Sequence, residues 1–206
     1  MTRSWFALAA LALLGGATPS HAQLAVVEGT VVTASRRLGE IVVYLVPDEQ
    51  TLLSAPEGTP SIDQVNLTFV PKVLAVTPGT TVEFLNSDPF LHNVFSPERP
   101  GPGFDLGTYP DTESRSHTFE EIGAHVILCH VHPEMYAYVV VVPTPFRATV
   151  DEDGGFRIDG VPSGQYTVKV WQRHESELTP KLVVGEGDLR LTLDLSSGNL
   201  TVRVRG

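Results

Sequence analysis

Short runs rich in β-branched and aromatic residues recur along the chain, and Gly, Pro, Asn and Asp separate them. The clearest of these runs are Glu28–Thr33, Glu40–Val46, Thr80–Leu85 and Tyr136–Val142. Such runs favour β-strands with turns between them, and no stretch of helical period is long enough to compete. Many short strands at regular spacing predict an all-β fold built from sandwiches or barrels.

The segment Met1–Ala22 is typical of a secretory signal peptide. Arg3 gives a positive start, Trp5–Ala17 is a continuous apolar run, and Ser20–Ala22 is a small-residue cleavage site. The run is too short to span a bilayer, which needs about 20 apolar residues. We therefore expect cleavage after Ala22 and a mature chain in the periplasm or outside the cell, without membrane insertion. An uncleaved membrane anchor is the alternative.

The charge of the chain narrows the choice of partners. The formal net charge is −10 over 206 residues, and cleavage after Ala22 removes Arg3 and changes it to −11. An acidic protein suits neither nucleic acid nor an anionic membrane surface, so we expect a basic protein partner. The length that remains after cleavage is enough for one large or two small domains.

Two segments divide the mature chain. The polar segment 48–61 is typical of a linker, and Pro143 and Pro145 mark a second boundary because proline cannot continue a central strand. The unit between them, residues 62–143, contains 10 acidic and three basic residues and so has a net charge of −7. Most of the acidity is therefore concentrated in this unit.

The segments on either side of this unit resemble parts of one known domain. Phe146–Trp171 contains a hairpin turn at Asp153-Gly154 and resembles the transthyretin-like, carboxypeptidase-regulatory-like β-sandwich. Val27–Leu45 resembles the first two strands of such domains. The resemblance implies one sandwich built from residues 24–47 and 144–206, with a second sandwich inserted between its parts. A contiguous sandwich with a separate N-terminal hairpin is the alternative.

Cys129 is the only cysteine of the chain, and Met135 is the only methionine that signal cleavage would leave. A lone thiol in an oxidising compartment is a liability unless it is buried, paired between chains or bound to something. A thiolate and a thioether so close together in the sequence suggest a soft metal ion.

The segment Val126–Met135 supplies most of the ligands for such an ion. Cys129, His132 and Met135 follow a Cys-x-x-His-x-x-Met spacing on a short loop between two expected strands, so all three can converge on one point. A third strong ligand must come from elsewhere, and His92, which follows an earlier strand, is the candidate. Two imidazoles, one thiolate and a weak axial thioether form the trigonal blue-copper site.

This pattern resembles the ligand set of the cupredoxins, the blue-copper proteins. The loop Cys129–Met135 has the short amicyanin-like spacing, with a proline after its second histidine. His92-Asn93 resembles the pair in plastocyanin-like proteins whose asparagine helps to tie the two ligand loops together. Val70–Phe84 resembles the strand pair before that histidine. The resemblance covers residues 65–142 and implies a cupredoxin-like Greek-key β-sandwich.

The same resemblance assigns the metal ligands. It implies one type 1 copper ion with His92, Cys129 and His132 as equatorial ligands and Met135 as the axial ligand. One departure is His130, which directly follows the cysteine and is either an exposed bystander or an alternative ligand.

Other chemistries fit these residues less well. A structural zinc site prefers several Cys and His ligands and rarely takes Met, and a Cys-His nucleophile gives Met135 no role. Copper oxidases and nitrite reductases place a histidine before the blue-copper cysteine, where this chain has Leu128. The histidines that are not assigned to the single copper site are too few for a trinuclear centre. We therefore expect no enzyme activity.

The sequence favours a periplasmic carrier of single electrons between redox proteins, with a c-type cytochrome as a candidate partner. A copper-binding or delivery protein without an electron-transfer duty is one alternative. A scaffold or adhesion module with a structural copper ion is another. The physiological partner, the reduction potential and the oligomeric state do not follow from the sequence.

Overall fold

The computed structural model describes residues 24–34, 38–49, 58–97, 100–173, 180–196 and 201–205. Within these ranges the chain forms 17 strands and one short 3-10 helix, η1 (Leu38–Glu40). The predicted all-β class is therefore confirmed. The predicted signal peptide (1–22) and most of the predicted linker (50–57) lie outside the described residues. No helix in the described ranges has the length and apolarity needed to span a membrane.

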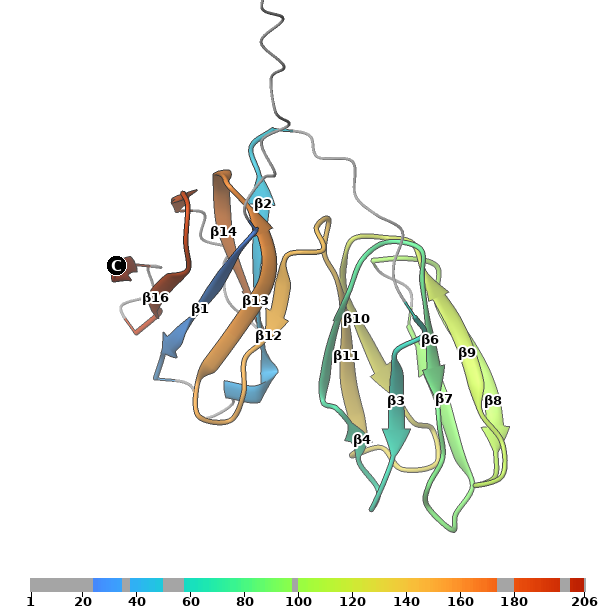
Figure 1. Ribbon diagram of the computed structural model, residues 1–206. Coiled ribbons are helices and arrows are strands. Elements are labelled where there is room, and N and C mark those ends of the chain that lie inside the picture. The colour runs from blue at the N-terminus through green and yellow to red at the C-terminus, as the bar shows by residue number, and fades with distance from the viewer. Residues whose placement is uncertain are drawn as a thin grey trace, which may run out of the picture.

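Four sheets form two sandwiches, which lie beside each other in Figure 1. The outer sandwich, as we call it, consists of two four-stranded sheets built from strands at both ends of the chain. In spatial order, one sheet contains β13 (Gly155–Pro162), β1 (Leu24–Val32), β16 (Leu189–Asp194) and β17 (Thr201–Arg205). The other contains β12 (Arg147–Thr149), β2 (Ile41–Pro47), β14 (Gly164–Gln172) and β15 (Lys181–Val184).

The inserted sandwich contains the remaining strands. Its five-stranded sheet has the order β5 (Val73–Val76), β11 (Tyr136–Val141), β10 (Gly123–Leu128), β7 (His92–Ser96) and β8 (Phe104–Tyr109). Its four-stranded sheet has the order β4 (Phe69–Val70), β3 (Ser61–Gln64), β6 (Thr80–Phe84) and β9 (Arg115–Phe119). The domain bounds and the transthyretin-like character of the outer strands stay predictions.

Alternating side chains explain why a strand such as β14 forms. Tyr166, Val168 and Val170 are buried in the core of the outer sandwich, whereas Thr167 and Lys169 between them are not fully buried. This period of two is what a strand with one buried face requires.

Strand β2 departs from this alternation because both of its faces are covered. Its odd-numbered residues Ile41, Val43 and Leu45 pack in the core of the outer sandwich. Its even-numbered residues Val42 and Tyr44 belong to a separate apolar cluster that also contains residues of the inserted sandwich. The continuous apolar run in the sequence therefore corresponds to a strand between two cores.

Strand β11 is the counterpart of β2 on the inserted side. Ala137, Val139 and Val141 point into the core of the inserted sandwich, whereas Val140 joins Val42 in the apolar cluster between the sandwiches. Burying one Val side chain contributes about 1.5–3 kcal/mol. An interface of several such residues therefore holds the two sandwiches together.

The strand order of the inserted sandwich also positions the loops that matter below. β7 and β10 are antiparallel neighbours, with Leu128 opposite Phe95. The chain leaves β10 at the sheet end where β7 begins, so the loop after Leu128 lies next to His92. Two segments that are far apart in the sequence thus meet at one end of the sheet.

Candidate metal centre

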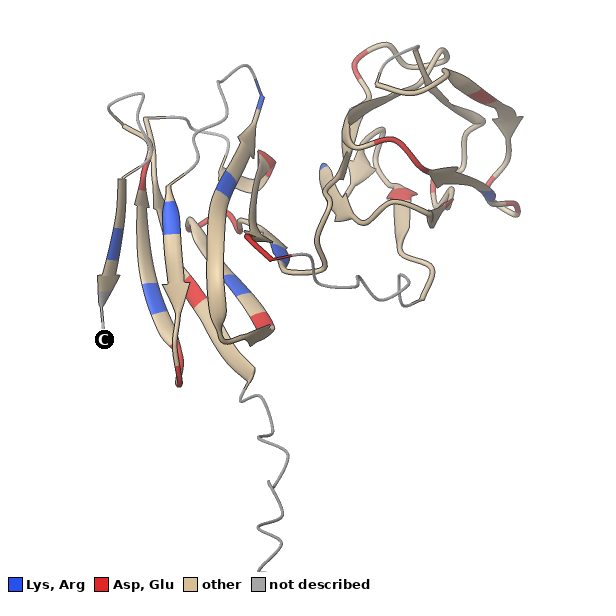
Figure 2. Ribbon diagram, turned by 90° about the horizontal axis from the view of Figure 1, so that it is seen from above, with Lys and Arg blue, Asp and Glu red and all other residues tan. Residues whose placement is uncertain are grey.

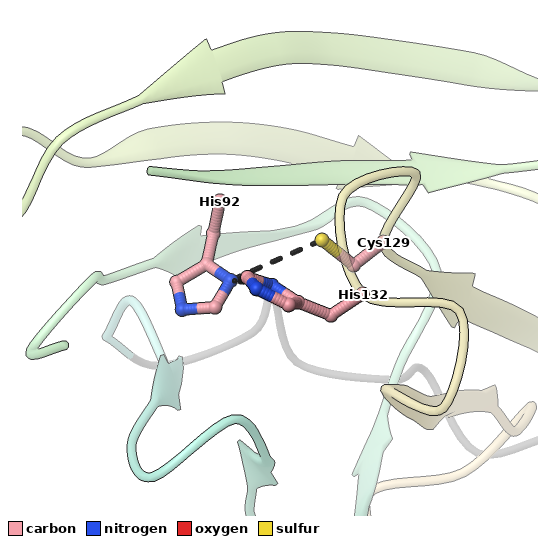
Figure 3. A group of neighbouring side chains, drawn as sticks. All are labelled: His92, Cys129 and His132. Atoms are coloured by element: carbon pink, nitrogen blue, oxygen red, sulfur yellow. Dashed lines mark hydrogen bonds between the residues drawn. The ribbon is translucent and has the colours of Figure 1, made fainter. Parts of the chain in front are cut away.

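Three of the four predicted ligands meet at one point. The ligand atoms of His92, Cys129 and His132 all lie within 4.8 Å of one another. The Nδ1 atom of His92 is 3.9 Å from Cys129 Sγ and 3.0 Å from His132 Nδ1. Figure 3 shows the His92 ring on its strand facing the loop that carries Cys129 and His132. Among the described residues, no other group of three His, Cys, Asp or Glu side chains converges in this way.

The group lies mostly inside the protein. His92 is fully buried and Cys129 is 3% exposed, while His132 is half-buried. Met135, the fourth predicted ligand, is also fully buried and packs in the same apolar cluster as Cys129. Its backbone N–H donates to the carbonyl of His132 at 3.0 Å, which closes the loop on itself.

Asp88 fixes the orientation of His92. Its carboxylate Oδ2 lies 3.0 Å from His92 Nε2, and its two oxygens also accept the backbone N–H groups of Asn66 and Leu67 at 2.6 and 2.8 Å. Burial of Asp88 opposes its ionisation, but the N–H groups of Leu67 and Asn66 and the His92 ring outweigh this, so its pKa is lowered from the ordinary value.

This hydrogen bond determines which nitrogen of His92 can bind a metal. An ionised carboxylate only accepts hydrogen bonds, so His92 Nε2 must carry the proton. The lone pair then lies on Nδ1, the atom that faces Cys129 and His132. Proteins usually orient a metal-binding histidine by a carboxylate, a backbone carbonyl or a water molecule on the far nitrogen, and Asp88 is in that position here.

Asp88 also holds a turn that would otherwise be strained. Asn66 and Leu67, whose N–H groups it accepts, have φ values of 52° and 58°. Asparagine adopts this left-handed conformation readily, but for Leu67 it costs about 1–2 kcal/mol. The buried carboxylate offsets this cost and ties the turn to the metal centre.

Asn93 connects the two segments that supply the ligands. Its backbone N–H donates to Cys129 Sγ at 3.5 Å, and its side-chain Oδ1 accepts the N–H of His130 at 3.3 Å. The Nδ2 group donates to Asp105 at 2.6 Å. The tie expected from the cupredoxin resemblance is therefore present, and it places a backbone N–H on the sulfur.

His130 lies outside the converging group. Its ring stacks on Phe95 with 3.7 Å between ring centroids, and its Nε2 is 3.5 Å from the Asp105 carboxylate. The backbone N–H of Gly107, the side chain of Asn93 and His130 together lower the pKa of Asp105, against a smaller effect of burial. The exposed His130 is thus held on the surface, away from the ligand atoms.

Two further histidines also lie outside the group. His125 is buried in β10, a central strand of its sheet, and its Nε2 lies 2.8 Å from the carbonyl of Glu121. β7 and β11 flank β10 on both sides, so His125 lies in the interior of its sheet. His117 stacks on Phe104, and burial lowers its pKa.

The donor set suits copper. A thiolate and a thioether are soft ligands, and two imidazoles bind copper in both oxidation states. Asp88 is the functional residue that sequence reasoning missed. The sequence shows an Asp-x-x-x-His spacing, but the spacing alone does not indicate a role for Asp88, because its backbone partners belong to a turn much earlier in the chain.

Comparison with known proteins gives partial likenesses. No family model and no curated protein matches the sequence. Among solved structures, a purple cupredoxin from Nitrosopumilus maritimus is 26% identical, with 40% of this chain and 99% of that chain covered and a TM-score of 0.36. A reduced mutant of amicyanin is 25% identical, with 48% and 98% covered and a TM-score of 0.40. A Cu(I) mutant of amicyanin is 26% identical, with 42% and 84% covered and a TM-score of 0.39.

Proposed function

We propose that this chain is a type 1 copper protein that carries single electrons. The observation that carries the proposal is the convergence of two imidazole nitrogens and one thiol sulfur on side chains of which two are buried and one is half-buried. His92, Cys129 and His132 would be the strong ligands and Met135 the weak axial one. A bound copper ion would supply the change between Cu(I) and Cu(II), and carrying single electrons requires no other chemistry.

The protein residues hold the ligands in one arrangement for both oxidation states. Asp88 and Asn93 fix His92 and the sulfur of Cys129 through buried hydrogen bonds. The N–H on the sulfur withdraws charge from a thiolate, and such hydrogen bonds tune the potential of blue-copper sites. Strands β7 and β10 supply a rigid frame, so little rearrangement accompanies the transfer of an electron.

Burial favours electron transfer over copper delivery. A delivery protein must release its ion, and release is easier from exposed ligands on a loose loop. Here His92 and Cys129 are buried, and only His132 reaches a half-buried position. Copper should therefore resist transfer to a chelator, and rapid loss to one would favour the delivery alternative.

The surface near the ligands supports a protein partner. Phe90, Leu91 and Val131, each about half exposed, are sequence neighbours of the ligands His92 and His132. Large exposed apolar residues that gather in one region mark interaction sites. Docking there would bring a partner close to the half-buried imidazole of His132.

Charge would select the partner. The inserted unit has a net charge of −7, and Figure 2 shows most Lys and Arg positions on the outer sandwich instead. A basic redox protein would be attracted to the acidic unit over a long range. A basic c-type cytochrome in the periplasm is the partner class that we propose, in line with the secretory signal that the sequence predicts.

The test is a spectrum of the copper-loaded protein. We expect strong thiolate-to-copper absorption in the visible range and a paramagnetic resonance signal typical of type 1 copper. Cys129→Ser should abolish the absorption, whereas His130→Gln, which changes the neighbouring exposed imidazole, should retain it. A colourless Cu(II) complex of the unaltered protein would contradict the proposal.

A further inference from the structure

A cluster of four charged or aromatic residues spans the two sandwiches beside the metal loop. Tyr136 is the first residue after Met135 and opens β11. The cluster contains two residues from each sandwich, Glu40 and Arg173 from the outer one and Lys72 and Tyr136 from the inserted one. We call this set the Tyr136 cluster.

The outer sandwich binds the Tyr136 side chain directly. The phenol of Tyr136 donates to Glu40 Oε1 at 3.0 Å. Glu40 ends the short helix η1 just before β2, so the acceptor belongs to a segment much earlier in the chain. The guanidinium carbon of Arg173 lies 5.2 Å from the centroid of the Tyr136 ring, within the range of cation–π attraction.

The inserted sandwich holds the backbone of the same residue. Lys72 Nζ donates to the carbonyl of Tyr136 at 3.0 Å and lies 4.4 Å from the centroid of its ring. Register pairing between β11 and β5 begins only at Tyr138. Lys72 therefore binds Tyr136 just beyond the paired part of these two strands.

The position of Tyr136 gives these contacts a consequence for the metal loop. The loop begins at Cys129, after β10, and ends at Met135, before β11. Leu128 and Tyr136 form the last pair between the two strands, so they are the two bases of the loop. Whatever fixes Tyr136 fixes the end from which the axial thioether projects.

We infer that Tyr136 is a positioning residue through which the outer sandwich, by way of Glu40 and Arg173, holds the end of the metal loop and sets the position of Met135. This inference rests on the proposed copper function. It assigns a role to the outer sandwich, whose described residues otherwise contribute nothing to the metal centre. The axial ligand tunes the potential of a type 1 site, so the outer sandwich would act on the potential from outside the copper fold.

Tyr136→Phe tests the inference with the smallest change, because it removes the hydroxyl and leaves the ring. The matched control is Tyr138→Phe, the same change two residues along the same face, where the ring packs on Trp171 at 5.3 Å between centroids. Glu40→Ala removes the same hydrogen bond from the side of the outer sandwich. None of these changes touches a metal ligand.

The first measurement uses the metal-free protein. A hydrogen bond to a carboxylate is strong enough to change a local opening equilibrium about tenfold. We therefore expect amide hydrogen exchange at Met135 and Tyr136 to become about tenfold faster in Tyr136→Phe and in Glu40→Ala. Tyr138→Phe should leave it unchanged.

The second measurement uses the copper-loaded protein and records its absorption spectrum and its reduction potential. If Tyr136 only stabilised the fold, its replacement would change neither. Tyr136→Phe should shift the thiolate-to-copper absorption and the reduction potential, and Tyr138→Phe should shift neither. Unchanged exchange or an unchanged spectrum in Tyr136→Phe overturns the inference. If the unaltered protein forms no blue complex, the proposed function fails, and the exchange experiment alone decides whether the Tyr136 cluster holds the loop.

Discussion

Replacement of Asp88 by Asn should destabilise the metal-free protein strongly, although the two side chains have the same shape. Asp88 is 4% exposed and accepts three hydrogen bonds, from Asn66, Leu67 and His92. An amide has only one accepting oxygen. In the better of its two orientations, that oxygen keeps the bonds of Leu67 and His92, and the NH₂ group faces the N–H of Asn66.

The magnitude follows from these contacts. Asn66 is itself exposed, so loss of the acceptor for its N–H costs about 1 kcal/mol, and loss of the carboxylate charge weakens the two remaining bonds by a further ~1 kcal/mol in total. Two left-handed residues also lose their anionic partner. We therefore expect Asp88→Asn to lower the free energy of unfolding by about 2 kcal/mol.

Urea unfolding of the metal-free protein at neutral pH measures this loss. The control is Asp105→Asn, which also removes a carboxylate bonded to Asn93 and to a backbone N–H. Its side chain is 53% exposed, so water replaces the lost contacts and the cost should stay below about 1 kcal/mol. Equal losses in the two variants would refute the reasoning.

The pH dependence of the free energy of unfolding, compared between the unaltered protein and Asp88→Asn, gives an independent check. The pKa of Asp88 is lowered in the folded protein below its ordinary value of 3.8. The unfolded chain therefore binds this proton first, and the stabilisation is complete above pH 3.8. It is lost as the pH falls through the lower folded-state pKa, so the difference between the unaltered protein and Asp88→Asn should shrink in that acidic range.

Three further predictions concern the axial ligand, the outer core and the partner. Met135→Leu should keep the fold, with a cost below about 1.5 kcal/mol because the volume is conserved, but should shift the reduction potential in voltammetry; an unchanged potential would count against Met135 as a ligand. Leu45→Ala should lower the free energy of unfolding by about 2–5 kcal/mol, whereas the exposed Val183→Ala should change it by less than about 0.5 kcal/mol. The rate of electron transfer to a basic c-type cytochrome should fall steeply as salt is added, and a rate independent of salt would argue against electrostatic steering.

The sequence predicted the strands well where a single face is buried. The run Thr80–Leu85 predicted a strand, and in β6 the residues Thr80, Val82 and Phe84 are buried whereas the residues between them are not fully buried. The continuous run in β2 also predicted a strand, but not its second buried face. Val42 and Tyr44 are covered only because the two sandwiches pack together, and no local pattern encodes that contact.

At the candidate site, too, the sequence predicted what lies close along the chain. Cys129 and His132 lie on one loop, so their spacing alone places them together. His92 was the candidate third ligand because it follows an earlier strand, and the resemblance to the cupredoxin pattern supported it. Asp88 could not be found in this way, because its role depends on the turn at Asn66 and Leu67, which folding brings next to it. Tyr136 was visible only as a strand residue, since its partner Glu40 belongs to the other sandwich.

X-ray absorption at the copper edge, recorded for the oxidised and the reduced protein, tests the central claim most directly. We predict one sulfur at short distance and two imidazole nitrogens around the ion in both oxidation states, with little change between them. In Cys129→Ser, the same measurement should show no sulfur at short distance. A shell of nitrogen and oxygen atoms without sulfur, or a shell that rearranges on reduction, would contradict an electron carrier built on His92, Cys129 and His132.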